Sequence, residues 1–323
     1  MKEVKVQDAV GQILCHDVTQ IIRGVTKGAR FRKGHIITAE DIPELLKLGK
    51  ENIFVWENDE TKLHENDAAE ILKNICQGEN LTASEVKEGK IELAATCDGV
   101  FSVDADKLNE INAVDEICIA TLNNKIAVRK NKIVAGMRVI PLVIEKSKMA
   151  RVQEIAGNSA LMKISPYKNF RVGLVVTGSE IFHGRIEDTF SAVIESKLKT
   201  FGLEINWRRV SDDSREMTRE KICELLDLGA EMIICTGGMS VDPDDRTPAA
   251  IKSTGAEIVT YGVPVLPGAM FMLAYRGEIP ILGLPGCVMY CSKTIFDLVL
   301  PRILAGERLT RRDFTILGVG GLL

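Results

Sequence analysis

Residues 175–180, 233–240 and 281–286 read VVTGSE, IICTGGMS and ILGLPG. Each stretch is a short apolar run, rich in Val, Ile and Leu, that stops at a glycine. The runs are too short for helices and lack the polar alternation of a half-exposed strand, which predicts three buried parallel strands. The carboxyl ends of parallel strands face the same way, and ligands bind in the crevice above them. We therefore expect the three glycine breaks to lie at one edge of a sheet.

The residues around these runs have the patterns of helices and further strands. Asp188 precedes apolar residues at a 3.6-residue spacing that end at Gly202, and Thr247-Pro248 combines an N-cap residue with a first-turn proline. Other helices are predicted at 215–228 and 288–305, and strands at 203–210, 256–261 and 270–275. Strands and helices in alternation predict a doubly wound α/β domain with a mostly parallel sheet over residues 166–310.

The preceding residues 1–165 are predicted to be a mixed α+β region rich in strands. We expect β structure over residues 4–18 and helices over 41–48, 67–76 and 108–114. Asp98-Gly99 is a type I′ turn dipeptide and predicts a hairpin, and the short strands between 117 and 144 predict a β meander. Residues 1–60 and 61–165 are candidate subdomains, and residues 311–323 a candidate C-terminal tail.

Composition limits the class of protein. The chain has 323 residues, enough for two or three units, and 46% of them are hydrophobic. A net charge of -4 gives no reason to expect nucleic acid or an acidic membrane as the main partner. With no long apolar segment, we expect no membrane span and a cytoplasmic location. The eight cysteines form no C-x-x-C pair and are expected to be reduced thiols.

The glycine breaks have the chemistry of an anion site. Glycine lets backbone N–H groups approach a phosphate closely, and hydroxyls nearby add donors. The expected donors are Gly178, Ser179, Gly237, Gly238 and Ser240. A plain tight turn is the alternative reading of the Gly237-Gly238 pair.

Carboxylates follow the same strands. Glu180, Asp213 and Asp245 stand at or next to strand ends, and Asp242 and Asp244 are close to Asp245 in the chain. Acids beside a phosphate are unfavourable unless a cation lies between them, and Mg²⁺ takes oxygen ligands from both. The alternative is that each acid caps a helix or turn, which is the reading we favour for Asp188.

In this order and spacing the motifs resemble the molybdopterin-binding domain of molybdenum cofactor biosynthesis proteins, over about residues 171–306. The resemblance rests on TGSE at 177–180, Asp188, Asp212-Asp213, TGGMSV at 236–241, Asp245, Pro267-Gly268 and LPG at 284–286. The TGGMSV run is closer to the molybdenumtransferase, whereas Asp245-Arg246-Thr247-Pro248 is similar to the adenylyltransferase.

The resemblance implies a transferase that binds molybdopterin or its adenylylated form, inserts molybdate and releases AMP with the help of Mg²⁺. It implies catalytic roles for Glu180, Asp213 and Asp245, with Asp213 and Asp245 as metal ligands. The implied ligand-binding residues are Thr177, Gly178, Ser179, Thr236, Gly237, Gly238, Ser240, Pro267, Gly268, Pro285 and Gly286. It also implies a homo-oligomer, a dimer or trimer, and a molybdoenzyme as a further partner.

Two departures from the family pattern favour an alternative. Cys287 and Val288 stand where the transferase has asparagine and proline, and its N-terminal Asp-Gly-Tyr-Ala signature is absent. The alternative is a non-catalytic protein that carries or delivers the cofactor. A nucleotide pyrophosphatase is a third reading, disfavoured because this domain comes second in the chain.

Overall fold

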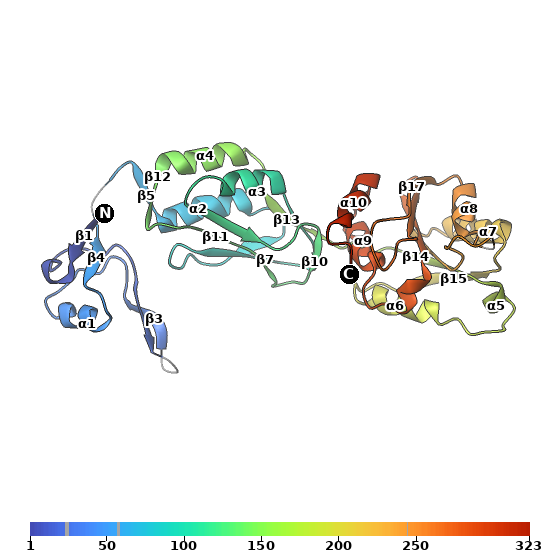
Figure 1. The fold of residues 1–323 in the computed structure, drawn as a ribbon, viewed down its shortest axis with the longest axis horizontal. Helices are drawn as coiled ribbons and strands as arrows, with labels where there is room; N and C mark the ends of the chain where they lie inside the picture. Colours follow the sequence, from blue (N-terminus) through green and yellow to red (C-terminus); the bar gives the residue numbers. More distant parts are fainter. Residues whose placement is uncertain (23–25, 57–58, 244) are drawn as a thin grey trace. The chain divides into compact units, whose positions relative to one another are not determined.

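The computed structural model describes residues 1–22, 26–56, 59–243 and 245–323. These residues form two compact units (Figure 1). The first comprises Met1–Cys97, Phe101–Asn124 and Arg129–Ile164, and the second comprises Asp98–Val100, Lys125–Val128 and Ser165–Leu323. Every helix in the described ranges is too short or too polar to cross a membrane.

The second unit is built on a six-stranded sheet with the order β15-β14-β16-β19-β18-β17. Its strands are β14 (Val172–Thr177), β15 (Ile205–Ser211), β16 (Met232–Thr236), β17 (Glu257–Tyr261), β18 (Met272–Arg276) and β19 (Ile279–Leu284). β15, β14, β16 and β19 are parallel, and β18 is antiparallel to both of its neighbours. The predicted mostly parallel α/β sheet is confirmed.

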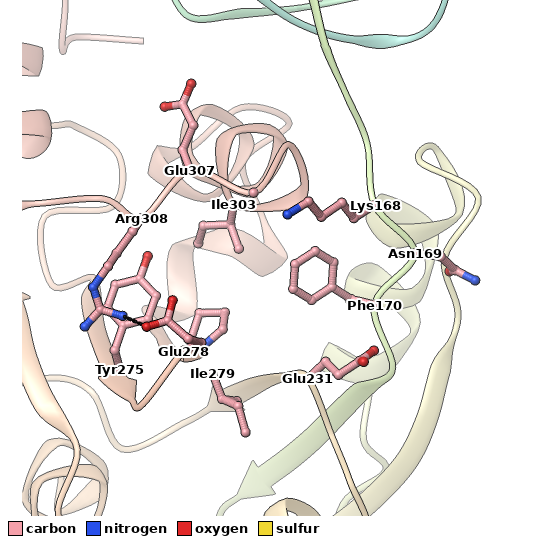
Figure 2. A pocket seen from close by; sticks show the side chains of 12 residues that line it. Lys168, Asn169, Phe170, Glu231, Tyr275, Glu278, Ile279, Ile303, Glu307 and Arg308 are labelled. Carbon is pink, nitrogen blue, oxygen red and sulfur yellow. Dashed lines mark hydrogen bonds and ion pairs between the residues drawn. The ribbon is translucent and has the colours of Figure 1, made fainter.

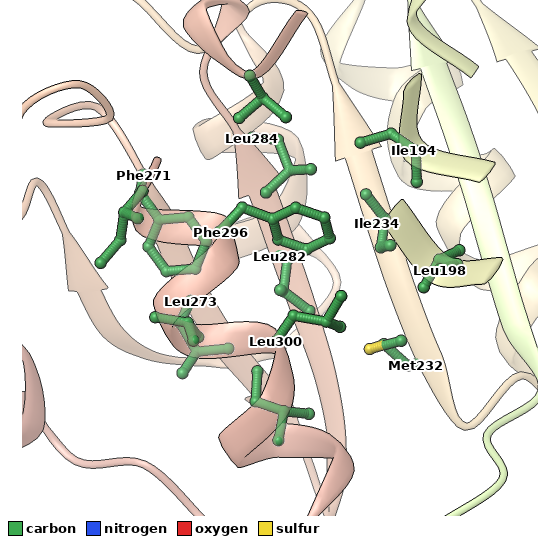
Figure 3. Close-up of a cluster of buried hydrophobic side chains, with 14 of the residues drawn as sticks. Ile194, Leu198, Met232, Ile234, Phe271, Leu273, Leu282, Leu284, Phe296 and Leu300 are labelled. Atoms are coloured by element: carbon green, nitrogen blue, oxygen red, sulfur yellow. The ribbon is translucent and has the colours of Figure 1, made fainter. Parts of the chain in front are cut away.

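Helices cover both faces of this sheet, which explains why its central strands are continuous apolar runs. The helices are α5 (Ser179–Phe182), α6 (Phe190–Lys199), α7 (Arg215–Asp227), α8 (Thr247–Ser253), α9 (Ile295–Leu304) and α10 (Arg311–Thr315). On one face, Leu198 of α6 and Phe296 of α9 pack over Ile234 and Leu282 (Figure 3). On the other face, α7 and α8 contribute a second buried cluster. Each fully buried Leu or Ile contributes about 1.5–3 kcal/mol of transfer free energy.

Helix boundaries follow local hydrogen bonds. Asp188 caps α6 as predicted, since its Oδ1 accepts from the N–H groups of Phe190 and Ser191 at 2.9 and 3.0 Å. The predicted helix over 288–305 was too long. Residues Gly286–Met289 form a 3₁₀ turn, and α9 begins only at Ile295 because Thr294 and Asp297 make a reciprocal capping box.

The residues after α9 are part of the second unit. α10 places Phe314 in the buried cluster, where its ring centroid lies 5.9 Å from that of Phe271. Leu266 N–H donates to the carbonyl of Gly321 at 2.7 Å, so residues close to position 323 pack against the loop between β17 and β18.

The first unit is mixed α+β, as predicted. In the chain's opening part β1 (Lys2–Lys5) pairs with β4 (Asn52–Val55), and β2 (Val18–Ile22) pairs with β3 (Thr26–Phe31). The remaining elements of the chain before β14 are α1 (Asp41–Lys47), β5 (Lys62–His64), α2 (Glu65–Cys76), β6 (Leu81–Ala83), β7 (Ile91–Ala95), β8 (Gly99–Val103), α3 (Ala105–Asn112), β9 (Ile117–Thr121), β10 (Ile126–Val128), β11 (Ile133–Val139), β12 (Val143–Glu145), α4 (Lys146–Ala156) and β13 (Met162–Pro166). Of these, β10 and the start of β8 belong to the second unit.

Three predictions for residues 1–165 were wrong. Residues 4–18 are not one β segment, because a 3₁₀ turn at Val6–Asp8 interrupts it. β7 and β8 do not form a hairpin, and the strands from 117 to 144 do not form a meander. One sheet has the order β6-β7-β11-β9, whereas β8 and β10 belong to a sheet ordered β10-β8-β13. Local turn signals predicted the strands but could not predict their non-local partners.

Candidate functional site

The ends of the central parallel strands are level with one another. Thr236 at the end of β16 pairs in register with Val176 of β14 and with Leu284 of β19. The glycine breaks after these strands therefore lie at one edge of the sheet, as the sequence predicted. This edge is called the ligand edge below.

Hydroxyl groups fasten the loops at the ligand edge. Thr177 Oγ1 donates to the carbonyl of Thr236 at 2.9 Å and lies 3.3 Å from Oγ1 of Thr247 on α8. The N–H of Thr247 donates to the carbonyl of Gly238 at 3.2 Å. Gly237 has φ +87°, and a Cβ there would lie 2.4 Å from the carbonyl oxygen of Thr177. A side chain at position 237 would therefore displace the strand end beside it.

Thr236 has a different environment. The residue is 1% exposed, and Oγ1 is a buried polar atom for which the described residues offer no hydrogen-bond partner. Its strand neighbours Met232 and Ile234 face the cluster under α6 and α9, so the alternation of side chains directs Thr236 to that same face. A buried hydroxyl without a partner costs about 1–3 kcal/mol, which a bound ligand or water molecule would offset.

Asp213, which follows β15, supports the loop after β14. Asp213 Oδ2 accepts from the N–H of Ser179 at 2.8 Å, and the N–H of Gly178 donates to the carbonyl of Ser211 at 3.2 Å. These two N–H groups therefore already have protein partners, in contrast to their predicted role as phosphate donors. Glu180 is exposed on α5, and its Oε1 lies 3.3 Å from where a Cβ on Gly178 would be.

The loop after β16 carries the remaining predicted residues. Ser240 is exposed, and Asp245 is half-buried with its N–H donating to the carbonyl of Asp242 at 3.0 Å. Asp244 lies outside the described residues. Burial raises the pKa of Tyr261, and the negative charge of Asp245 raises it further.

A preformed metal centre is not evident at the ligand edge. In the described ranges, three His, Cys, Asp or Glu side chains do not gather closely enough to hold an ion. Mg²⁺ nevertheless binds through one or two carboxylates together with water and substrate phosphates. The carboxylates of Asp213 and Asp245 stay the predicted ligands of such a site, in which the ligand itself would supply the missing oxygens.

The reversed strand brings Pro267 and Gly268 to the same edge. β18 begins there because Met272 pairs with Gly283 near the end of β19. Gly268 lies against the start of α9, where a Cβ would be 2.5 Å from Cγ2 of Ile295. The carbonyl of Pro267 accepts from the N–H of Ile295 at 3.3 Å. The loop thus supports the segment that follows Pro285-Gly286.

Sequence reasoning missed three residues at the ligand edge. Thr247 was read only as a helix cap, yet it contacts Thr177 and the carbonyl of Gly238. Met239 and Tyr261 fix the loop after β16 through packing and a hydrogen bond. For Tyr261 the sequence offered one signal, its position as the last residue of the predicted strand 256–261. That position indicates that Tyr261 lies at an edge of the sheet, but it does not indicate that the hydroxyl bonds to the carbonyl of Met239.

A cavity of about 340 Å³ lies at the other edge of the sheet and is not lined by the predicted residues (Figure 2). Its lining includes Phe170 before β14 and Glu231 before β16, and Tyr275 and Ile303. Arg308 stacks over Tyr275 at 4.3 Å, and several of the acids at this cavity have basic partners. Since these charges are satisfied, the chemistry of the ligand edge is the better guide to function.

Comparison with known proteins identifies the second half of the chain. Residues 173–305 match the family model described as a probable molybdopterin binding domain. These residues therefore form a molybdopterin-binding domain. Residues 3–57 match a second model, described as a domain of unknown function.

The curated relatives match only part of this chain. A molybdopterin molybdenumtransferase of Staphylococcus epidermidis is 29% identical over 134 residues, which are 39% of this chain and 32% of the relative. The molybdenum cofactor synthesis protein cinnamon of Drosophila melanogaster is 28% identical over 140 residues, 41% of this chain and 23% of the relative. The chain thus spans about a third of the transferase that it matches.

A solved structure has a wider but weaker likeness. The molybdopterin biosynthesis MoeA protein of Pyrococcus horikosii covers 94% of this chain and 74% of its own, at 14% identity and a TM-score of 0.37. The assignment of the domain rests on the sequence match over residues 173–305.

Proposed function

We propose that this protein acts in molybdenum cofactor biosynthesis, as a transferase that binds adenylylated molybdopterin at the ligand edge and inserts molybdate as AMP is released. The main support for the proposal is that β14, β16 and β19 end at the same level. Gly178, Gly237 and Pro285, which follow these strands, therefore lie at one edge of the sheet. The family match over residues 173–305 and the names of the curated relatives support it.

In this proposal the chain's residues hold the phosphates. The N–H groups of Gly237 and Gly238 and the Ser240 hydroxyl donate to phosphate oxygens, because the two glycines turn the loop away from the strand with positive φ. Thr236 Oγ1 supplies a further donor. Asp213 holds Ser179 and so fixes the loop after β14.

The proposed reaction breaks the phosphoanhydride bond between AMP and the pterin phosphate. An oxygen of water or molybdate attacks phosphorus, a new phosphorus–oxygen bond forms there, and AMP leaves with the bonding electrons. Asp245 orients the attacking oxygen and accepts the proton that is released when this oxygen belongs to water, since a molybdate oxygen carries none. Glu180 is close enough to the Gly178 loop to assist. Mg²⁺, when bound through Asp213, Asp245 and phosphate oxygens, would neutralise the charge that develops on the phosphate.

Incubation with adenylylated molybdopterin, Mg²⁺ and molybdate tests the proposal. The wild type should release AMP, Asp245→Asn should release at least about tenfold less, and the exposed Asp227→Asn should match the wild type. No AMP release, together with no binding of molybdopterin, would refute the proposal.

The second candidate is a carrier that binds and delivers the finished cofactor without turnover. It is favoured by the absence of a gathered acid cluster among the described residues and by Cys287 in place of the family's asparagine. A carrier predicts tight molybdopterin binding that Asp245→Asn leaves unchanged, with no AMP released. A dimer or trimer and a molybdoenzyme partner remain proposals, which sedimentation and co-purification would test.

A further inference from the structure

The loop that follows β16 is held down onto the neighbouring strands. Met239 is 3% exposed, and its Cε lies 2.5 Å from where a Cβ on Gly283 would be. The absence of a side chain on Gly283 therefore makes room for Met239 on β19. Gly283 is on β19 and pairs with Met272 of β18, so the loop after β16 lies across the ends of β19 and β18.

A tyrosine fixes the far side of this loop. Tyr261 Oη donates to the carbonyl of Met239 at 3.0 Å and lies 3.4 Å from the carbonyl of Ser240. Tyr261 is the last residue of β17, the outermost strand of the sheet, and its register with Met272 puts it at the ligand edge. Its side chain therefore links the edge strand to a loop that begins three strands away.

The surroundings of the phenol explain why this contact matters. A phenol has one proton to donate, and here it faces the two loop carbonyls, both of which are acceptors. A tyrosine side chain is protonated at neutral pH, so it remains a donor. The hydrogen bond thus ties the peptides of Met239 and Ser240 to one fixed point on the sheet.

We propose that Tyr261 is a positioning residue that latches the loop of residues 237–240 in the conformation that binds the ligand's phosphate. The identity of that ligand rests on the proposed function, whereas the latch itself does not. Without the hydroxyl, the loop samples other conformations, and binding must then select or order the competent one. Loss of one neutral hydrogen bond corresponds to an affinity loss of about three- to tenfold.

Two matched variants of the full chain test the proposal. Tyr261→Phe removes the hydroxyl and retains the ring. Tyr290→Phe makes the same change at a tyrosine that is 84% exposed and follows the 3₁₀ turn after Pro285. For each protein, hydrogen exchange of peptides covering residues 236–242, the dissociation constant for molybdopterin and the melting temperature would be measured. The exchange measurement needs no ligand.

The expected result in Tyr261→Phe is faster exchange at 236–242 and about three- to tenfold weaker molybdopterin binding, with a melting temperature lower by no more than the few degrees that one hydrogen bond contributes. Tyr290→Phe should match the wild type in all three measurements. If AMP release is detected, Tyr261→Phe should raise KM and leave kcat nearly unchanged, because the substrate and its transition state are bound more weakly to the same extent.

Other results would overturn the proposal. Unchanged exchange in Tyr261→Phe would show that the hydroxyl does not latch the loop. Faster exchange with unchanged affinity, or a lower melting temperature that accounts for the affinity loss, would reduce Tyr261 to a structural role. Wild-type protein that does not bind molybdopterin would sink the proposed function, and the exchange data would still decide the latch.

Discussion

Replacing Gly237 with alanine tests the geometry on which the ligand edge depends. Gly237 and Gly255 have nearly the same φ, +87° and +82°. A Cβ on Gly237 would lie 2.4 Å from the backbone carbonyl oxygen of Thr177, whereas a Cβ on Gly255 would have nothing within 4 Å. Gly255→Ala is therefore a control that shares the conformational strain without the steric clash.

The expected magnitudes follow from these two effects. An alanine forced to positive φ costs about 1–2 kcal/mol, and this applies to both variants. The clash at Gly237 involves backbone rather than a flexible side chain, so the strand end must shift, at a cost of about 1–3 kcal/mol typical of overpacking. We expect Gly237→Ala to lower the free energy of unfolding by about 2–5 kcal/mol, against about 1–2 kcal/mol for Gly255→Ala.

The chain offers a specific probe for this measurement. It has two tryptophans, Trp56 in the first unit and Trp207 in the second, where Trp207 packs against the buried cluster of α7 and α8. In a Trp56→Phe background, urea unfolding followed by Trp207 fluorescence reports on the second unit. Agreement with circular dichroism would test two-state behaviour. Equal losses in Gly237→Ala and Gly255→Ala would refute the close approach between Gly237 and Thr177.

Three further predictions concern stability. Thr236→Val removes a buried hydroxyl that has no partner among the described residues, so it should leave the free energy of unfolding unchanged or raise it by about 1 kcal/mol while weakening ligand binding. Thr177→Val removes a hydroxyl that makes a hydrogen bond, so it should lower the free energy of unfolding by about 1 kcal/mol. Arg302→Met should lower the free energy of unfolding by about 2–4 kcal/mol, because Glu307 and Asp313 lose their nearly buried arginine partner. Arg171→Met, which breaks an exposed ion pair with Glu231, should lower it by less than about 1 kcal/mol. Burial lowers the pKa of His64, so the unfolded chain binds more protons below about pH 6.5. The stabilising contribution of neutral His64 should be complete above that pH and be lost as the pH falls through the folded pKa, and His64→Gln should abolish this dependence.

Urea midpoints of each pair of variants check the first two predictions. A destabilised Thr236→Val protein would mean that the hydroxyl already has a partner, and equal costs at Arg302 and Arg171 would mean that burial of the Arg302 cluster does not matter. For His64, Trp56 is the natural probe, since its ring is stacked with the imidazole at a centroid distance of 6.2 Å. Identical slopes of stability against pH for wild type and His64→Gln, measured in a Trp207→Phe background, would contradict the third prediction.

The predictability of this protein differs between its two units for a physical reason. In the second unit the central strands β14, β16, β19 and β18 are buried on both faces, and α6, α7 and α9 begin at local capping residues, so the alternation of elements and the level strand ends follow from sequence patterns. Asp188 illustrates this, because its capping bonds involve residues two and three positions away. In the first unit, strands pair with distant partners, and nothing near Asp98-Gly99 indicates that β7 pairs with β11 rather than with β8.

The candidate site was predictable in its position but not in its internal contacts. The glycine and hydroxyl residues of the loops were identified from the sequence, yet the partner of the Ser179 N–H, Asp213, lies 34 residues away. The Tyr261 contact spans 22 residues and three strands. Such contacts depend on strand order, which a single sequence does not reveal. The catalytic and metal-binding roles of Glu180, Asp213 and Asp245 stay predictions.

The reversal of β18 has a consequence for how such a site can diversify. It brings the connection of residues 262–271 to the same side as the phosphate loops, although this connection joins a different pair of strands. Backbone bonds from Gly262 to Phe271 and from Val263 to Ala269 close the base of the connection, and its tip packs against the start of α9. A change at the tip would therefore act on the segment after Pro285-Gly286 rather than on the register of the parallel strands. Variants that accept a differently shaped ligand should therefore be sought first in this connection.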